Sequence, residues 1–210
     1  MNGKILLIIY FDKETMFYFF QWSYLSKEDL LQNGNYKEMR KKQDDLISIK
    51  GIGELCGKFL AYILVSKKFF KDFQINLIGF GLGCYVIKEC IKEMTKINKS
   101  TFFVKIKNVI LIGASMTITK EQSWKNYIEE IVVDKFINCY STKDEILKKF
   151  YYLISKNKEK NPIGVKPLEI KNEKGKNLVI NHDFTENSFD LLSYDLGVVV
   201  KKIFEYYKDI

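Results

Sequence analysis

The residues best placed to do chemistry surround a glycine-rich turn in the stretch INLIGFGLGCYVIKECI, which covers residues 75–91. Three glycines, Gly79, Gly81 and Gly83, follow an apolar run and precede an amphipathic one. A buried strand, a tight turn and a helix, in that order, are the layout with which enzymes expose a nucleophile or bind a phosphate group. Gly81, at the tip of the turn, has no side chain that could react.

Phosphate binding is one interpretation of this turn, because the free N–H groups at the start of a helix attract anions. The dinucleotide fingerprint is G-x-G-x-x-G, however, and Cys84 occupies its third glycine position. The phosphate-loop pattern fails as well, since no Gly-Lys-Ser/Thr sequence follows. Nucleotide or phosphate binding over Gly79–Gly83 is therefore an alternative and not the leading interpretation.

A nucleophile elbow, G-x-S-x-G, matches the spacing more closely. Gly79 and Gly83 occupy the two flanking positions, where neighbouring atoms approach too closely for a Cβ atom. Gly81 stands where the reactive serine would be. The pattern predicts an elbow that keeps its frame and lacks its hydroxyl group.

Other residues could supply the missing chemistry. Cys84 lies near the expected helix start, where thiol pKa values fall, but lone cysteines in apolar segments are typical of the core. Ser115, Asp144 and His182 could form a relocated triad, which would make the protein an active serine esterase or lipase. His182 is the only histidine, so a histidine-based metal cluster is excluded, and we expect neither a metal nor a cofactor.

Alternating strand and helix patterns must position these residues. Continuous apolar runs separated by amphipathic helices predict an α/β fold, with a mostly parallel sheet and helices on both faces, in a single domain over residues 1–210. Ligands in such folds lie beyond the carboxyl ends of the strands, where the turn lies. Strands are expected at residues 4–11, 15–22, 75–79, 109–114, 135–141 and 178–180. Helices are expected at residues 26–31, 52–64, 83–97, 120–130 and 144–154 and from 192 to the end, with polar connections at 32–48 and 155–177.

The net charge of +8 is carried almost entirely by lysine, since Arg40 is the only arginine. The lysines mostly alternate with acidic residues, which favours a solvated surface over a nucleic-acid interface. The longest apolar runs, residues 5–11 and 59–65, are too short to cross a bilayer. With no sorting signal, a soluble protein in the cytoplasm is the default expectation.

Five short segments occur in the same order as in a known family. They are INLIGFGLGCYVIKEC (75–90), NVILIGA (108–114), FINCYSTKDEIL (136–147), NPIG (161–164) and DFTENSFDLLSYDLGVVVKKI (183–203). Through them the chain, from about residue 15 to 209, resembles the α/β-hydrolase-fold family typified by transmembrane and coiled-coil domain-containing protein 4. The resemblance implies an α/β-hydrolase-like fold that is truncated at its N-terminus and lacks the membrane-spanning segments of that family.

The same resemblance implies a degenerate catalytic triad. The serine of the family falls on Gly81, its acid on Asp144 and its histidine on Leu191, so only the acid is retained. Acyl transfer needs an attacking oxygen and a base that accepts its proton. Losing either one costs roughly a million-fold in rate. Without an imidazole to orient, Asp144 is expected to form hydrogen bonds at the start of helix 144–154.

The leading hypothesis is a catalytically inactive α/β-hydrolase-like protein that acts as a structural or interaction subunit of a larger assembly. Its expected partners are other protein subunits, contacted through aromatic and lysine-rich surfaces. No residue indicates an acyl ligand in the remnant of the pocket, although such a ligand is a further alternative. An active esterase that uses His182 and a phosphate-binding turn are the competing hypotheses.

Overall fold

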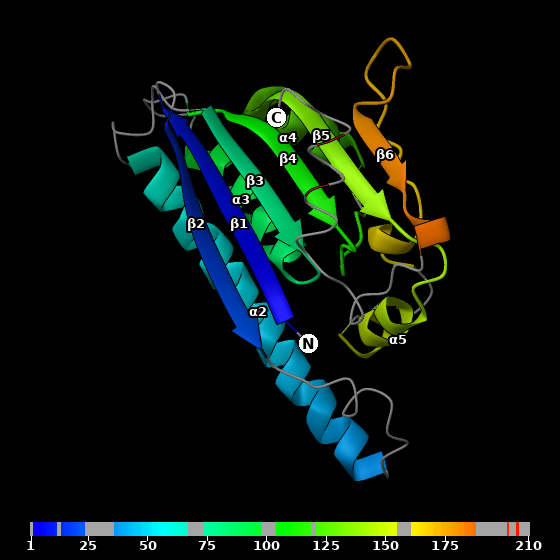
Figure 1. Ribbon diagram of the computed structural model, residues 1–210. Helices are drawn as coiled ribbons and strands as arrows, with labels where there is room; N and C mark the ends of the chain where they lie inside the picture. Colours follow the sequence, from blue (N-terminus) through cyan, green and yellow to red (C-terminus); the bar gives the residue numbers. More distant parts are fainter. Residues whose placement is uncertain are drawn as a thin grey trace.

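The computed structural model describes most of the chain. The described residues are 2–11, 14–23, 36–66, 74–97, 104–118, 121–154 and 161–187, with Lys201 and Glu205. Six strands within these ranges form one sheet, in the order β2-β1-β3-β4-β5-β6 (Figure 1). They are β1 (Asn2–Phe11), β2 (Glu14–Ser23), β3 (Gln74–Phe80), β4 (Ile106–Ile112), β5 (Val132–Tyr140) and β6 (Val179–Asp183).

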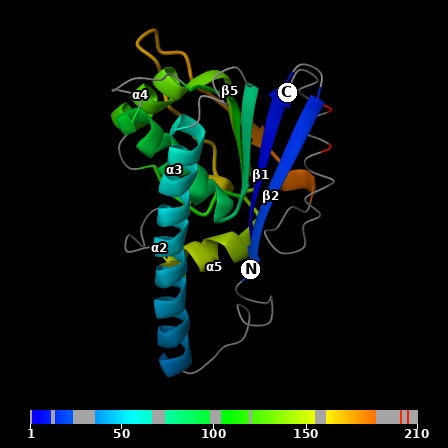
Figure 2. The ribbon, with the colours of Figure 1, turned by 90° about the vertical axis from the view of Figure 1, so that its left-hand side faces the viewer.

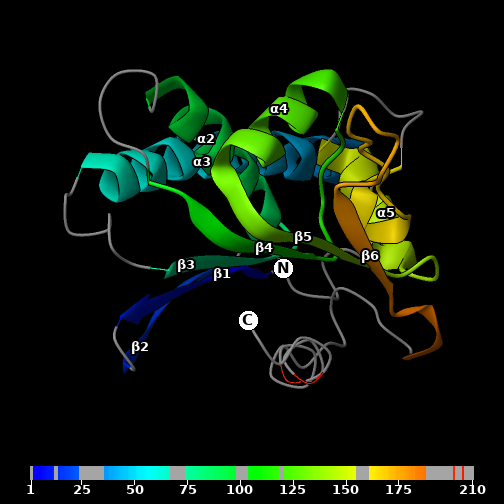
Figure 3. The same cartoon turned by 90° about the horizontal axis from the view of Figure 1, so that it is seen from above.

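The sheet is parallel from β3 to β6, and the hairpin of β1 and β2 extends it in the antiparallel sense. The helices are α2 (Tyr36–Ser66), α3 (Gly83–Ile97), α4 (Glu121–Ile131) and α5 (Glu145–Ile154), with 3-10 turns η2 (Ile163–Val165) and η3 (Thr185–Asn187). Helices α2, α3 and α4 lie along one face of the sheet (Figure 3). The predicted α/β fold with a mostly parallel sheet flanked by helices is confirmed.

The apolar core lies between the sheet and the layer of α2, α3 and α4. Successive residues of a strand point to opposite faces of the sheet. In β3, Ile75 and Leu77 belong to the core cluster on the helix side. Every residue of β3 after Gln74 is nevertheless buried, so the centre of the sheet is shielded from solvent on both faces.

Helix α2 is longer than predicted. The stretch expected to be a polar connection is helical from Tyr36 onward, because Lys, Glu, Gln and Met favour helices even without an apolar stripe. The N-terminal part of α2 projects beyond the sheet (Figure 2). Cys56, expected in the core, is exposed.

Two predicted helices fall largely outside the described residues, namely residues 26–31 and the terminal helix that begins near 192. Within the latter, Lys201 and Glu205 are helical. Their charged groups lie 4.0 Å apart, one helical turn from each other.

Small residues allow α2 to pack closely against α3. A Cβ atom on Gly57 would lie 2.5 Å from the backbone oxygen of Val86 and 2.8 Å from Cβ of Glu89. A Cβ atom on Gly51, in the same helix, would have no neighbour within 4 Å. The two glycines therefore differ in their structural role. Close packing requires Gly57, whereas Gly51 contributes no packing and only lowers the helix propensity.

Replacing each glycine with alanine tests this packing. Gly57→Ala is expected to lower the free energy of unfolding by about 1–3 kcal/mol, because backbone atoms of α3 must move. Gly51→Ala is expected to raise it by up to about 1 kcal/mol through helix propensity. Urea unfolding monitored by circular dichroism measures both. Equal effects of the two substitutions would contradict the close contact of α2 with α3.

Candidate functional site

Gly81 forms the sharp junction between β3 and α3. It follows Phe80, the last residue of β3, and precedes the helix start by two positions. Its φ angle is +57°, in the left-handed region that glycine adopts without steric cost. The Gly81 N–H donates to the Ile112 carbonyl oxygen at 3.0 Å, and the Gly81 carbonyl accepts from the Ser115 N–H at 3.4 Å. These bonds hold the turn against the end of β4.

Gly79 is required by the approach of α3 to β3. A Cβ atom at this position would lie 2.7 Å from Cδ1 of Ile87 and 2.9 Å from the backbone nitrogen of Cys84. The latter contact is with backbone, which cannot be relieved by a change of rotamer. Gly83, the other flanking glycine, is the buried first residue of α3.

Segments that follow β4 and β5 meet at Gly164. Its N–H donates to the Ala114 carbonyl at 3.1 Å, and its own carbonyl accepts from the Ser141 N–H at 3.0 Å. The neighbouring Ile163 N–H donates to the Met116 carbonyl at 2.9 Å. A Cβ atom on Gly164 would lie 2.3 Å from the Ala114 nitrogen. Glycine at this position allows three loops at the carboxyl end of the sheet to pack together.

Asp144 is fully buried and caps α5. Its Oδ1 atom accepts a hydrogen bond of 2.8 Å from the Leu147 N–H, as expected from the sequence for the start of this helix. Its backbone carbonyl also accepts from the Lys148 N–H at 3.2 Å. A carboxylate at a helix N-terminus satisfies an otherwise unpaired donor and complements the helix dipole.

Two serine hydroxyl groups are buried in the same region. Ser115 is 2% exposed and Ser141 is fully buried. Within the described part of the chain, neither hydroxyl oxygen has a hydrogen-bond partner. Ser115 lies beside the elbow, because its N–H contacts the Gly81 carbonyl. Ser141 was not singled out in the sequence analysis, although it lies in the FINCYSTKDEIL segment.

Cys84 belongs to the core. Its thiol is fully buried and donates to the Ile112 carbonyl oxygen at 3.6 Å. Burial raises the pKa of this thiol, and the hydrogen bond offsets the effect only in part. Burial likewise raises the thiol pKa of Cys90 and Cys139. The reactive thiolate form of Cys84 is therefore disfavoured at neutral pH.

His182 lies within β6, in register with Cys139 of β5. Its ring centroid is 4.7 Å from that of Phe184. Partial burial lowers the pKa of His182, and the neighbouring Asp183 opposes this effect without cancelling it. Leu191, the position that the hydrolase resemblance assigns to the histidine, lies outside the described residues.

Two asparagines, the buried Asn138 and the half-buried Asn181, position the segment between α5 and β6, and sequence analysis had not identified them. The Asn138 Nδ2 atom lies 3.2 Å from the carbonyl oxygens of Ile163 and Lys166 and from Oδ1 of Asn181. Asn181 in turn bonds both the N–H and the carbonyl of Leu168, at 2.7 and 2.9 Å. The only sequence signal was the place of Asn138 in the FINCYS stretch.

A cavity of about 450 Å³ opens next to this segment. It is lined by Thr117, Ile118, Glu121, Asn161, Ile163, Lys166, Pro167, Leu168 and Glu169. The lining includes neither Gly81 nor Asp144, so the cavity is separate from the elbow. Among the residues whose positions are described, no group of three or more His, Cys, Asp or Glu side chains could hold a metal ion.

The capping role of Asp144 can be tested by two substitutions. Asp144→Ala is expected to lower the free energy of unfolding by about 1–2 kcal/mol, because the Leu147 N–H loses its acceptor. Asp144→Asn keeps an acceptor oxygen and is expected to lose less than half as much. Denaturant titrations of both variants give the comparison. If the asparagine variant were as unstable as the alanine variant, the hydrogen bond would not be the main role of Asp144.

Thiol accessibility tests the assignment of Cys84 to the core. Native protein treated with a chromogenic disulfide reagent is expected to react rapidly at Cys56, the exposed cysteine, and slowly at Cys84, Cys90 and Cys139. Mass spectrometry of the labelled peptides identifies the site, and denatured protein serves as the control for complete reaction. Rapid labelling of Cys84 in the native state would overturn the assignment.

Several curated proteins are similar to parts of the chain. Transmembrane and coiled-coil domain-containing protein STS1 of Oryza sativa is 35% identical over 91 residues, which cover 43% of the chain and 13% of STS1. An uncharacterized membrane protein of Caenorhabditis elegans is 30% identical over 152 residues, covering 72% of the chain and 21% of that protein. Probable lipase MIL1 of Saccharomyces cerevisiae is 35% identical over 91 residues, covering 43% of the chain and 8% of MIL1. The chain has no significant match among solved structures.

These names correct the predicted cytoplasmic location. That prediction rested on the lack of a sorting signal. It is wrong, because relatives from rice, Caenorhabditis elegans and Schizosaccharomyces pombe are named as transmembrane or membrane proteins. None of the helices described in this chain is long and apolar enough to span a bilayer. The chain corresponds to only 8 to 21% of the length of the three relatives above.

The larger part of the sequence matches a known protein family. Residues 49–203 match it, so the match starts in the middle of α2 and includes the elbow, Asp144 and His182. This match covers well over half of the 210 residues. The chain therefore belongs to the family described as protein of unknown function (DUF726).

Proposed function

We propose that the chain is a catalytically inactive α/β-hydrolase-like domain that serves as an interaction module in a larger, membrane-associated assembly. One observation carries the proposal. Gly81 occupies the sharp strand-to-helix junction at which an enzyme of this fold carries its nucleophile, and it has no side chain to attack a substrate. Without that oxygen, the acyl-transfer route loses roughly a million-fold in rate.

The features retained around the elbow have structural explanations. Gly79 is needed because α3 crosses β3 too closely for a Cβ atom. Asp144 is needed because its Oδ1 atom caps α5. Neither role depends on chemistry, so a chain that had lost catalysis would keep both residues in order to fold.

The comparisons support a hydrolase-like ancestry and a membrane setting. One relative is named a probable lipase, and others are named membrane proteins. The resemblance to the α/β-hydrolase family typified by transmembrane and coiled-coil domain-containing protein 4 points the same way. In this chain the serine is replaced by Gly81 and the histidine by Leu191, which favours binding over turnover. Other protein subunits are the proposed partners.

An active serine hydrolase with a relocated triad is the second candidate. The observation that favours it is the buried Ser115 hydroxyl, which has no partner among the described residues and lies beside Gly81. In this candidate Ser115 would attack the substrate, His182 would accept its proton, and Asp144 would orient the imidazole. The depressed pKa of His182 would keep its imidazole neutral and able to act as a base.

A fluorophosphonate probe separates the two candidates. We expect no labelling of the purified chain and no hydrolysis of p-nitrophenyl esters above the buffer rate, with an authentic serine esterase as positive control. Stoichiometric labelling that disappears in Ser115→Ala, together with turnover that disappears in His182→Ala, would replace the proposal with the second candidate. Ser141→Ala is the matched control, because Ser141 is also a buried serine without a described partner.

A further inference from the structure

Helix α2 carries a stripe of apolar side chains that is open to solvent. Ile52, Leu55, Phe59 and Tyr62 are 46%, 66%, 68% and 53% exposed, although all four are large and apolar. Their spacing of three, four and three residues places them on one face of the helix. We call these four residues the α2 stripe.

The α2 stripe is not used to hold the helix in place. The opposite side of α2 packs on α3 through Gly57, and Ala61 and Leu64 on that side are fully buried. The structure buries only this side of α2 and leaves the α2 stripe exposed. An apolar surface that is exposed and contiguous usually marks a binding site, whereas scattered exposed apolar residues do not.

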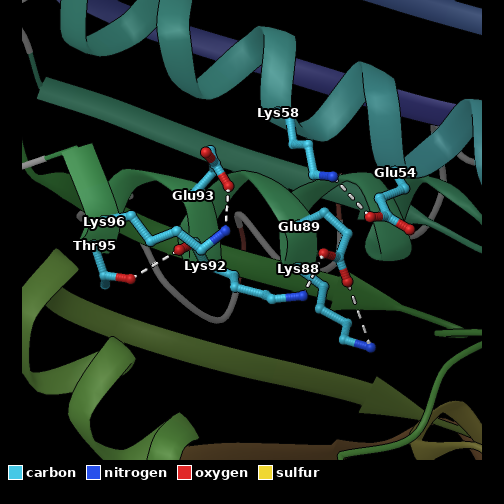
Figure 4. A network of polar contacts seen from close by, with 8 residues as sticks. All are labelled: Glu54, Lys58, Lys88, Glu89, Lys92, Glu93, Thr95 and Lys96. Carbon is cyan, nitrogen blue, oxygen red and sulfur yellow. Dashed lines mark hydrogen bonds and ion pairs between the residues drawn. The ribbon is translucent and has the colours of Figure 1, made fainter.

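Lysines of α2 and α3 form ion pairs near the contact between the two helices (Figure 4). Lys58 lies three residues from Leu55 and four from Tyr62, so it borders the α2 stripe. Lys58 of α2 and Lys92 and Lys96 of α3 have side chains that are 38%, 41% and 57% exposed. Each pairs with a glutamate, at Nζ–O distances of 2.8, 3.0 and 2.6 Å. We call these three residues the lysine rim.

On α3 the glutamates lie deeper than the lysines, whereas on α2 Glu54 is as exposed as its partner Lys58, at 41% and 38%. Glu89 is 4% exposed and lies within 3.0 Å of Lys92 and 3.7 Å of Lys88, and the Glu93 side chain is 14% exposed. The ammonium groups of Lys92 and Lys96 therefore stand between the α3 carboxylates and the solvent. The α3 side of the contact between the two helices presents positive charge outward.

We propose that the α2 stripe and the lysine rim dock together on an anionic lipid bilayer surface. This inference deepens the proposed function, and it rests on only one part of that proposal, namely that the domain acts at a membrane. Apolar side chains on one face of a helix enter the headgroup region to a depth of about 5–10 Å, and bordering lysines bind anionic headgroups. Phe59 and Leu55, the two most exposed members of the stripe, would enter most deeply, and the Tyr62 hydroxyl would stay at headgroup level.

Charge complementarity distinguishes this partner from a second copy of the chain. In a two-fold symmetric contact between α2 stripes, the lysine rims of both copies would be brought to the same interface. Like charges placed together oppose association. The whole chain also carries a net charge of +8, which favours an anionic surface at longer range.

Vesicle flotation of the full chain tests the proposal. We expect binding to phosphatidylcholine vesicles that contain about 30% phosphatidylserine, and at least tenfold weaker binding to phosphatidylcholine alone. Raising the salt concentration from about 0.05 to about 0.5 M should weaken binding by screening the lysine rim. A wild-type chain that binds neither kind of vesicle would overturn the proposal.

Matched double substitutions identify the docking surface. Leu55→Glu with Phe59→Glu is expected to reduce the vesicle partition coefficient at least tenfold. The control is Val133→Glu with Tyr152→Glu, which adds the same charge at apolar side chains that are 64% and 50% exposed elsewhere. The partition coefficient of this control should stay within about twofold of the wild-type value. Neither of its substitutions removes an apolar side chain from the proposed contact with the bilayer. Thermal unfolding of both variants establishes that each is folded.

Two outcomes would contradict docking through α2. Unchanged binding in the Leu55/Phe59 variant would place the contact elsewhere. A wild-type dimer in light scattering that this variant converts to a monomer would assign the stripe to a second copy. Fluorophosphonate labelling is read separately, so an active enzyme that still binds vesicles would overturn the inactivity and leave the docking surface standing.

Discussion

The contact between α3 and the carboxyl end of β3 governs the rest of the structure. On the strand side, Gly79 must lack a Cβ atom, because helix backbone lies within about 3 Å of where that atom would be. Gly81 turns the chain through a left-handed conformation that glycine adopts without strain. Once this turn is set, α3 lies against the sheet and the Gly81 backbone groups reach the end of β4. The turn therefore has a structural task that is independent of any reaction.

Much of the parallel sheet could be predicted because its strands are continuous apolar runs. Such runs occur where both faces of a strand are buried, and β3 and β4 meet that condition. The turn at Gly81 was predictable as well, since alternating glycines between an apolar run and an amphipathic run are typical of a tight strand-to-helix turn. Helix α3 followed from its strong amphipathic pattern, and its predicted bounds agree with the observed ones.

Other features depend on contacts that a single sequence does not contain. The Asn108 side chain donates to Asn76 at 2.8 Å, and this pair exists only because the register of β3 and β4 places the two residues side by side. The Asn138 contacts likewise require a distant loop to fold back over β5. In α2, the apolar pattern of one helix cannot show which of its two apolar sides meets a neighbour. The features that could not be predicted are thus those that depend on strand register or on contacts between distant segments.

The strand order has a consequence for other members of the family. The shared region starts at residue 49, within α2, so it contains β3 but neither β1 nor β2. In this chain β1 pairs with one edge of β3 along seven residues, from Lys4 with Phe80 to Tyr10 with Gln74. A buried strand edge with unsatisfied amide groups is costly and prone to intermolecular pairing. A homologue with the same sheet therefore needs a cover for that edge, and in this chain the hairpin of β1 and β2 provides it.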